Sequence, residues 1–205
     1  MKEKNEITIE DGTILVKTAR KVVTEYLKER KKISLEKSIQ DKFSYKSGVF
    51  VTLNNPIGLR GCIGYPLPDK RLFNALEDAA IAAAIEDPRF PPVKLEELDS
   101  ITFEVTVLTP PQTIKVDNPQ EYLGKIKIGQ DGLIVRYGYN SGLLLPQVPI
   151  EWEWNEREFL EHTCEKAGLP QDFWKNPEIE IQKFQGIIFK EKEPKGEIIE
   201  EELSG

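Results

Sequence analysis

The sequence contains very few of the residues that build metal centres and disulfide frameworks. Its 205 residues include only two cysteines, Cys62 and Cys164, and a single histidine. A structural zinc site uses about four protein ligands and a catalytic one about three, so the sequence predicts no zinc site of the usual kind. One histidine also gives no HExxH motif and no recognisable Ser-His-Asp arrangement. We expect both thiols to be free and reduced.

Long hydrophobic runs are scarce as well. The chain begins with the polar segment Met1 to Glu6, which lacks the apolar region of a secretory signal. No run approaches the roughly 20 apolar residues that span a bilayer. Phosphate-binding loops of the GxxxxGK[ST] and GxGxxG types are also missing. We therefore expect a cytoplasmic protein without a membrane segment.

Positive charge is in deficit. The chain has 28 Lys and Arg residues against 35 Asp and Glu residues, which gives a net charge of −7 at pH 7. A negative surface repels nucleic acid and anionic membranes, so we predict weak binding of duplex DNA. Basic residues nevertheless gather between Lys17 and Lys46, so a local basic face stays open as an alternative.

What is present is the composition of a folded globular protein. Hydrophobic residues make up 39% of the chain, enough to fill the core of one large domain or of one domain with a smaller lobe. The abundance of Lys, Glu and Ile beside a single Met resembles the composition of thermophile proteins.

Hydrophobic periodicity predicts both helices and strands. We expect strands at 48–53, 59–65, 101–108 and 178–190, a hairpin over 133–145, and helices at 11–30, 70–85 and 155–167. The first two strands are expected to pair, because Asn54-Asn55-Pro56 between them is turn chemistry. The pattern favours an α+β fold with a mostly antiparallel sheet, packed helices and a second, smaller lobe.

The boundaries follow from changes in composition along the chain. Pro110-Pro111 opens a region that we assign to the smaller lobe, residues 110–150. Residues 1–109 and 151–190 are expected to form the larger part. Residues 191–205 are rich in acidic side chains and lack aromatics, so they are predicted to be a flexible tail.

The hexapeptide Leu59 to Gly64 marks where an activity would have to lie. Glycines on both sides of Cys62 let the backbone bend or approach another group closely. Arg60 has the same strand parity as Cys62, so we expect both side chains on one face of the sheet. Cys62 is then a thiol presented to a cleft beside a cation, or else a buried structural thiol.

Three further polar residues are candidates for the same site. Arg89 follows Asp87-Pro88 and precedes two prolines, so its backbone is stiff, and with Arg60 it would suit a carboxylate or phosphate ligand. Glu104 is an acid on an apolar strand and is a candidate general base if it faces the site. Gln147 follows a very apolar strand at the expected lobe boundary. The alternatives are salt bridges for the arginines, a solvated Glu104 and a loop-bound Gln147.

Four blocks of sequence resemble the AMMECR1 domain family. They are Leu59-Arg60-Gly61-Cys62-Ile63-Gly64, Asp87-Pro88-Arg89-Phe90-Pro91-Pro92, Leu144-Leu145-Pro146-Gln147-Val148 and Thr163-Cys164-Glu165-Lys166-Ala167-Gly168. The resemblance covers roughly residues 10–190 and implies an α+β fold of two unequal subdomains with a cleft between them. The family has no established biochemical activity. Some prokaryotic relatives occur alongside Memo-like and radical-SAM proteins, which makes such proteins expected partners.

Two classes of function stay open on this basis. The first is an enzyme of unknown reaction with Cys62 and Glu104 as catalytic residues and Arg60, Arg89 and Gln147 as ligand-binding residues. The second is a non-enzymatic binding or scaffold protein for a protein partner or nucleic acid. The sequence identifies no cofactor, no metal and no substrate.

Overall fold

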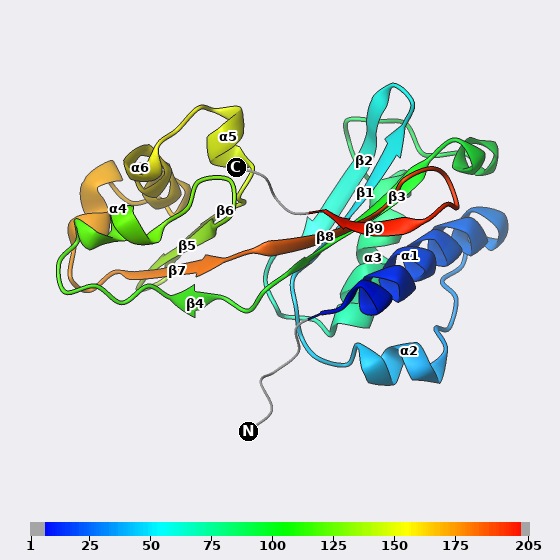
Figure 1. The fold of residues 1–205 in the computed structure, drawn as a ribbon, viewed down its shortest axis with the longest axis horizontal. Helices are drawn as coiled ribbons and strands as arrows, with labels where there is room; N and C mark the ends of the chain where they lie inside the picture. The colour runs from blue at the N-terminus through cyan, green and yellow to red at the C-terminus, as the bar shows by residue number, and fades with distance from the viewer. Residues whose placement is uncertain (1–6, 202–205) are drawn as a thin grey trace. The chain divides into compact units, whose positions relative to one another are not determined.

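Two antiparallel sheets organise the chain, and each lies in its own unit (Figure 1). The computed structural model describes residues 7–201. The first unit comprises residues 7–108 and 187–201, and the second comprises residues 109–186. Both units combine helices with an antiparallel sheet, so the predicted α+β class is confirmed.

The sheet of the first unit has five strands in the order β2-β1-β3-β8-β9. Their bounds are β1 Val49–Asn55, β2 Gly58–Tyr65, β3 Thr102–Leu108, β8 Gly186–Glu191 and β9 Ile198–Glu201. Every second residue of β1 and β3 is buried, as expected for a sheet with one covered face. The predicted pairing of the first two strands is present, with Thr52 of β1 opposite Cys62 of β2.

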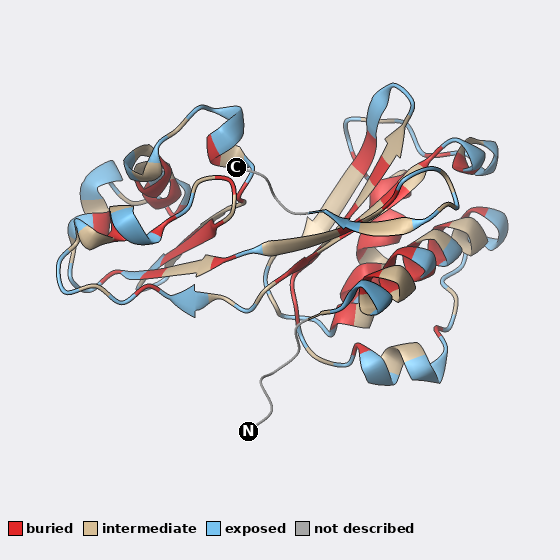
Figure 2. Ribbon diagram, viewed as in Figure 1, coloured by how far each residue is buried: buried red, intermediate tan, exposed pale blue. Residues whose placement is uncertain are grey.

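Helices α1 (Ile9–Glu29) and α3 (Leu72–Ile85) cover the buried face of this sheet (Figure 2). A capping box starts α1, with Thr8 as the N-cap residue and Asp11 at the third helical position. Alanine dominates α3, and its small side chains let the helix backbone approach the strands closely. Two short elements complete the unit, α2 (Lys37–Lys42) and the 3-10 helix η1 (Leu95–Asp99).

The sheet of the second unit has four strands in the order β4-β7-β5-β6. Their bounds are β4 Gln112–Thr113, β5 Gly132–Tyr137, β6 Asn140–Leu144 and β7 Glu180–Phe184. Its helices are α4 Glu121–Lys125, α5 Val148–Glu151, α6 Glu156–Lys166 and the 3-10 helix η2 Gln171–Lys175. Phe159, Cys164 and Trp174 are fully buried in the core of this unit.

The structure differs from the predicted boundaries in two places. Residues 151–186 belong to the second unit rather than to the larger one, because the expected strand over 178–190 is two strands, β7 and β8, in different sheets. The predicted flexible tail contains β9, which pairs with β8 through Ile198 and Ile199. These two apolar residues give an otherwise acidic segment a reason to join the sheet. Residues 202–205 of the predicted tail lie outside the described residues.

Residues 7–201 lack two features that are often tied to function. No helix there has a stretch long and apolar enough to cross a bilayer. No three His, Cys, Asp or Glu side chains in the same range are grouped as metal ligands. Cys62 and Cys164 are free thiols in different units.

Candidate functional site

Cys62, Thr52 and Glu104 form a row across three neighbouring strands of the first unit. Cys62 of β2 lies opposite Thr52 of β1, and Thr52 lies opposite Glu104 of β3. Residues that pair in this way project to the same face of a sheet with their Cβ atoms about 5 Å apart. The neighbours of Thr52 along β1, Val51 and Leu53, are fully buried on the helix-covered face. The row therefore lies on the opposite face, where each of its three members is half-buried.

The Thr52 hydroxyl group lies between the other two side chains of the row. Oγ1 of Thr52 lies 3.3 Å from Sγ of Cys62, and on its other side the Thr52 hydroxyl group lowers the pKa of the Glu104 carboxyl group. A hydroxyl group can accept one proton while it donates its own, so Thr52 has the chemistry to relay a proton between these two neighbours. The row can therefore pass a proton between Cys62 and Glu104.

Burial favours the protonated forms of both terminal groups. It raises the pKa of the Cys62 thiol, and the Glu104 and Asp87 carboxylates add to this rise, whereas the Thr52 hydrogen bond and the Arg89 charge oppose it. Burial also raises the pKa of Glu104, helped by Glu201 and opposed by Lys190. At neutral pH the thiol keeps its proton, and Glu104 holds its own up to a higher pH than an exposed glutamate.

Asp87 and Arg89 hold the backbone of Cys62 from outside the sheet. The Cys62 N–H donates to Oδ2 of Asp87 at 2.9 Å, and Nη2 of Arg89 donates to the Cys62 carbonyl at 3.3 Å. Nε of Arg89 also donates to Oδ1 of Asp87 at 3.0 Å, and Nη2 to Oδ2 at 2.8 Å. The Arg89 hydrogen bond keeps the pKa of the buried Asp87 carboxyl far below its usual range. Arg89 thus lies at Cys62, with 55% of its side chain exposed, and forms the salt bridge that was its alternative interpretation. Its assignment as a ligand-binding residue stays a prediction.

Arg60 does not share the face of Cys62, so that prediction is wrong. The pairing of β1 with β2 shifts by one residue between Leu53 and Asn54, which makes Arg60 an extra residue on its strand. Its side chain is buried, where Nε donates to Glu97 at 2.9 Å and Nη1 donates to the Pro91 carbonyl at 2.9 Å. Arg60 therefore fastens β2 to the segment that leads into η1.

The glycines of the hexapeptide are explained by close packing. A Cβ atom on Gly61 would lie 2.1 Å from the Ala83 carbonyl oxygen of α3, and one on Gly64 would lie 2.3 Å from the Phe50 ring. Only glycine fits these two places without a shift of backbone or ring. Two close contacts that only glycine permits therefore hold β2, one directly before Cys62 and one two positions after it.

Gln147 lies in the second unit, where it precedes α5. Its carbonyl oxygen accepts hydrogen bonds from the N–H groups of Ile150 and Glu151, which start this short helix. Its assignment as a ligand-binding residue stays a prediction.

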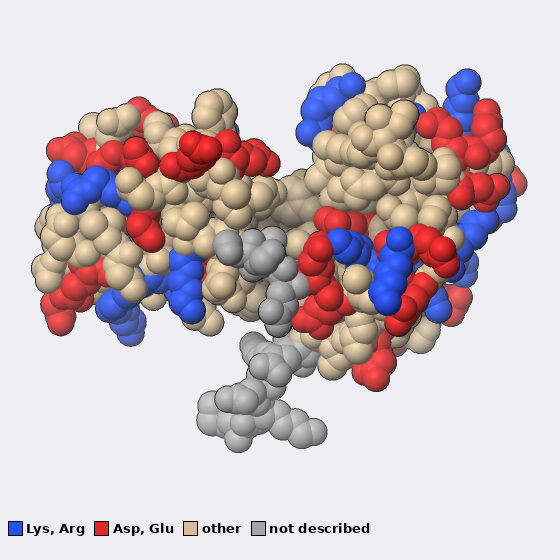
Figure 3. Space-filling model, turned by 45° about the horizontal axis from the view of Figure 1, so that its top comes forward, with Lys and Arg blue, Asp and Glu red and all other residues tan. Residues whose placement is uncertain are grey.

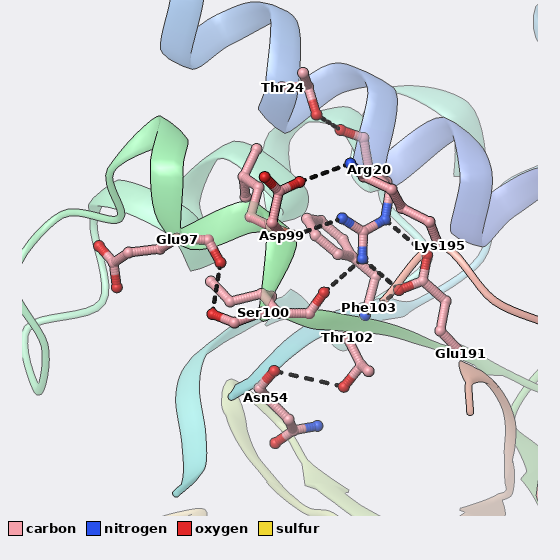
Figure 4. A network of polar contacts seen from close by, with 12 residues as sticks. Arg20, Thr24, Asn54, Glu97, Asp99, Ser100, Thr102, Phe103, Glu191 and Lys195 are labelled. Carbon is pink, nitrogen blue, oxygen red and sulfur yellow. Dashed lines mark hydrogen bonds and ion pairs between the residues drawn. The ribbon is translucent and has the colours of Figure 1, made fainter. Parts of the chain in front are cut away.

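A second polar centre of the first unit escaped the sequence analysis. Arg20 of α1 is surrounded by oxygen atoms, as Figure 4 shows. Its Nε donates to Glu191 of β8 at 2.7 Å, and its Nη atoms donate to Glu191 and to the carbonyl groups of Leu98 and Ile101. Glu191 also accepts from the Phe103 N–H at 3.0 Å. Arg20 and Glu191 are 171 positions apart, so no local pattern could have connected them.

Comparison with known proteins gives consistent results. The model of the AMMECR1 family matches residues 16–189. Protein MJ0810 of Methanocaldococcus jannaschii is 54% identical over 199 residues, which cover 96% of this chain and 98% of the relative. Protein MK0488 of Methanopyrus kandleri is 51% identical over 201 residues, 97% of each chain.

A solved structure agrees with these sequence matches. The crystal structure of the uncharacterized protein PH0010 from Pyrococcus horikoshii superimposes with a TM-score of 0.80 at 50% identity. The match covers 97% of this chain and 100% of that one. The matching segment contains the Cys62 row, the Asp87–Arg89 pair and Arg60. On the evidence of sequence and structure together, this chain belongs to the AMMECR1 family.

Proposed function

We propose that the protein is an enzyme in which Cys62 is the nucleophile and Glu104 is its general base, with Thr52 carrying the proton between them. The observation behind this proposal is the register of β2, β1 and β3, which aligns a thiol, a hydroxyl and a carboxyl group on the sheet face opposite the helices. A thiol that is protonated at neutral pH needs such a base before it can attack.

The reaction step follows from this arrangement. Sγ of Cys62 forms a bond to an electrophilic carbon, such as the carbonyl carbon of a small acyl compound, and the carbonyl electron pair moves to oxygen. The thiol proton passes to Oγ1 of Thr52 while the Thr52 hydroxyl proton passes to the Glu104 carboxylate. Arg89, whose charge acts on Cys62, favours the negative charge that develops nearby.

The raised pKa of Glu104 suits this role. General bases work best when their pKa lies near the working pH, and burial moves the pKa of Glu104 in that direction. Asp87, by contrast, is held ionised by Arg89 and is a poor base. A cytoplasmic location, where thiols stay reduced, is part of the proposal.

The test is the rate at which iodoacetamide alkylates Cys62 as a function of pH. With Glu104 as base, the wild-type rate below the thiol titration follows the ionisation of Glu104, and Glu104→Gln and Thr52→Val both slow it. If Glu104 acts only by charge, Glu104→Gln lowers the pKa of the thiol and speeds the reaction, which contradicts the proposal. Glu96→Gln, an exposed substitution in the same unit with the same charge change, is the matched control.

A second candidate function is binding of a protein partner through the second unit. Ile150 and Trp152, at the end of α5, are 46% and 66% exposed. Trp152 stacks on Trp154 at 6.0 Å between ring centroids, and Trp154 stacks on His162 at 3.8 Å, so the exposed indole is held in place. Exposed, preorganised tryptophan is typical of interface anchors.

The candidate partners are the Memo-like and radical-SAM proteins that the family resemblance implies. Co-purification with a Memo-like protein encoded in the same genome should fall with Trp152→Ala and persist with Tyr139→Ala, a change at another exposed aromatic of the second unit.

Nucleic acid is disfavoured as a ligand, because acidic and basic side chains are interspersed on the face of the first unit seen in Figure 3.

A further inference from the structure

A surface pocket of about 290 Å³ lies in the first unit between α1 and the β8–β9 hairpin. It is separate from the Cys62 row, and neither the sequence analysis nor the proposed reaction uses it. The residues that line it are Lys17, Arg20, Lys21, Glu191, Lys195, Gly196 and Ile198. Four of the seven are cations and one is an anion, although the whole chain carries a net charge of −7.

The only anion among the lining residues is already neutralised. Glu191 is buried and forms an ion pair with Arg20, which also donates to two backbone carbonyl groups (Figure 4). The Arg20 guanidinium lies over the Phe103 ring at 4.4 Å, which fixes its plane. The Arg20–Glu191 pair is thus a rigid, nearly neutral part of the pocket wall, and the remaining lining charges are all positive.

Those charges are the ammonium groups of three lysines from two elements. Lys17 and Lys21 are four residues apart on α1 and so lie on one side of the helix. Lys195 comes from the turn between β8 and β9 and has a left-handed backbone with φ of 63°, which is unfavourable for a lysine. The turn thus holds this lysine at the pocket in a conformation that glycine would adopt more easily.

The lysines are free to change partners. Lys21 pairs with Glu36 and Lys195 pairs with Asp99, and in both pairs each side chain is more than half exposed, so the attraction is weak. Lys17 forms no ion pair with any of residues 7–201. An anion that enters the pocket can therefore recruit all three ammonium groups while breaking only exposed pairs.

We propose that this pocket binds a small anion with two or more negative charges, held by Lys17, Lys21 and Lys195. Ammonium groups on flexible side chains act as point charges and bind phosphate and carboxylate groups alike. The pocket volume is near the lower end of the range for small-molecule sites, which suits a compact anion such as a phosphate ester or a tricarboxylate. Ile198 supplies an apolar wall for the carbon part of such a ligand.

The test is titration with sodium pyrophosphate and, separately, with sodium citrate, at an ionic strength kept constant with sodium chloride. Saturable binding by calorimetry is expected for at least one anion, and the stronger of the two identifies phosphate or carboxylate as the preferred group. In ¹⁵N-labelled protein the amide signals of Gly196 and Ile198 should shift with the same dissociation constant.

The matched variants distinguish the pocket from general charge. Lys17→Gln combined with Lys195→Gln should weaken binding on the order of tenfold or more. Lys31→Gln combined with Lys37→Gln removes the same two charges from exposed sites elsewhere in the unit and should leave binding unchanged. Unfolding curves without ligand check that each variant folds. Equal losses in both double variants, or no saturable binding of either anion by the wild type, would overturn the proposal.

Discussion

The two cysteines are both free thiols whose pKa is raised by burial, yet their surroundings are opposite. Cys164 lies in α6 with no exposed surface, among apolar side chains of the second unit, and its pKa is raised to about 11. Cys62 is half-buried on a strand, with Thr52 on its sulfur and Asp87 and Arg89 on its backbone.

The difference shows which neighbours make a thiol a candidate for chemistry. Cys164 is surrounded mainly by hydrocarbon, so its sulfur acts as a small apolar group. Cys62 has a hydroxyl, a carboxyl and a guanidinium group nearby, and each of these can move a proton or stabilise a charge. Raised pKa values alone would not have separated the two residues.

The largest expected effect is in thiol accessibility. Under native conditions at neutral pH, iodoacetamide should label Cys62 on the order of a thousandfold faster than Cys164, because the buried thiol reacts only after the second unit opens. Peptide mapping by mass spectrometry after timed pulses measures both rates in one sample. The two labelling rates should become similar in denaturant. Similar rates in the native protein would contradict the predicted difference between Cys62 and Cys164.

Removing the carboxylate beside Cys62 should have the next largest effect. Asp87→Asn loses charge-assisted hydrogen bonds to Arg89 and to the Cys62 N–H, which should destabilise the first unit by about 2–3 kcal/mol. Labelling of Cys62 should accelerate, whereas labelling of Cys164 in the other unit should not change. Equal acceleration at both cysteines would show that the two units unfold together.

The same substitution should change how the free energy of unfolding depends on pH in the acidic range. The folded-state pKa of Asp87 lies below its usual value of 3.8, so its contribution to stability is present above about pH 4 and is lost as pH falls towards the folded-state pKa. The stability gap between wild type and Asp87→Asn should therefore narrow below about pH 4. Denaturant unfolding at several pH values measures this, and a constant gap would contradict it.

A somewhat smaller effect is expected from filling the space next to Cys62. Gly61→Ala places a methyl group 2.1 Å from the Ala83 carbonyl oxygen, so α3 or β2 must shift. Overpacking of this kind costs about 1–3 kcal/mol. Gly124→Ala in the second unit is the control, because nothing lies within 4 Å of the new methyl group there. Equal melting temperatures for the two variants would contradict the close contact.

The smallest effect separates the two thiols themselves. Cys164→Ser buries a hydroxyl group in an apolar core and should cost about 1–3 kcal/mol. Cys62→Ser keeps Thr52 as a hydrogen-bond partner on a half-buried face and should cost less than about 1 kcal/mol. Chemical denaturation of the two variants compares them directly. A larger loss for Cys62→Ser would favour the alternative of a structural thiol at that position.

Structural features that depend on neighbouring residues could be predicted from the sequence. Asn155, a residue type favoured at helix starts, caps α6, and Gly168 follows the helix with φ of 74°, the left-handed conformation that glycine tolerates. The placement of Cys62 on a strand paired with the one before it was also correct. Each of these features depends on residues only a few positions apart.

Structural features that depend on residues far apart in the sequence could not be predicted from it. A shift of one residue in the pairing of β1 with β2 turned Arg60 away from Cys62, and nothing in the alternation of the hexapeptide indicates it. The joining of Cys62 to Glu104 required the order of three strands. The pocket at Lys195 required Ile198 and Ile199 to pair with β8, against the acidic composition of their surroundings.

The Asp87–Arg89 pair also has a consequence for how molecules of this protein meet one another. Strand β2 is the outermost strand of its sheet, and an open edge is a template on which a second chain can add a strand. At Cys62 the edge N–H and C=O groups are already bonded to Asp87 and Arg89. At the opposite edge, β9 carries Glu200 and Glu201, which repel the same residues of another copy. Because both of its edge strands are protected in this way, the sheet resists the edge-to-edge pairing of chains from which aggregates form.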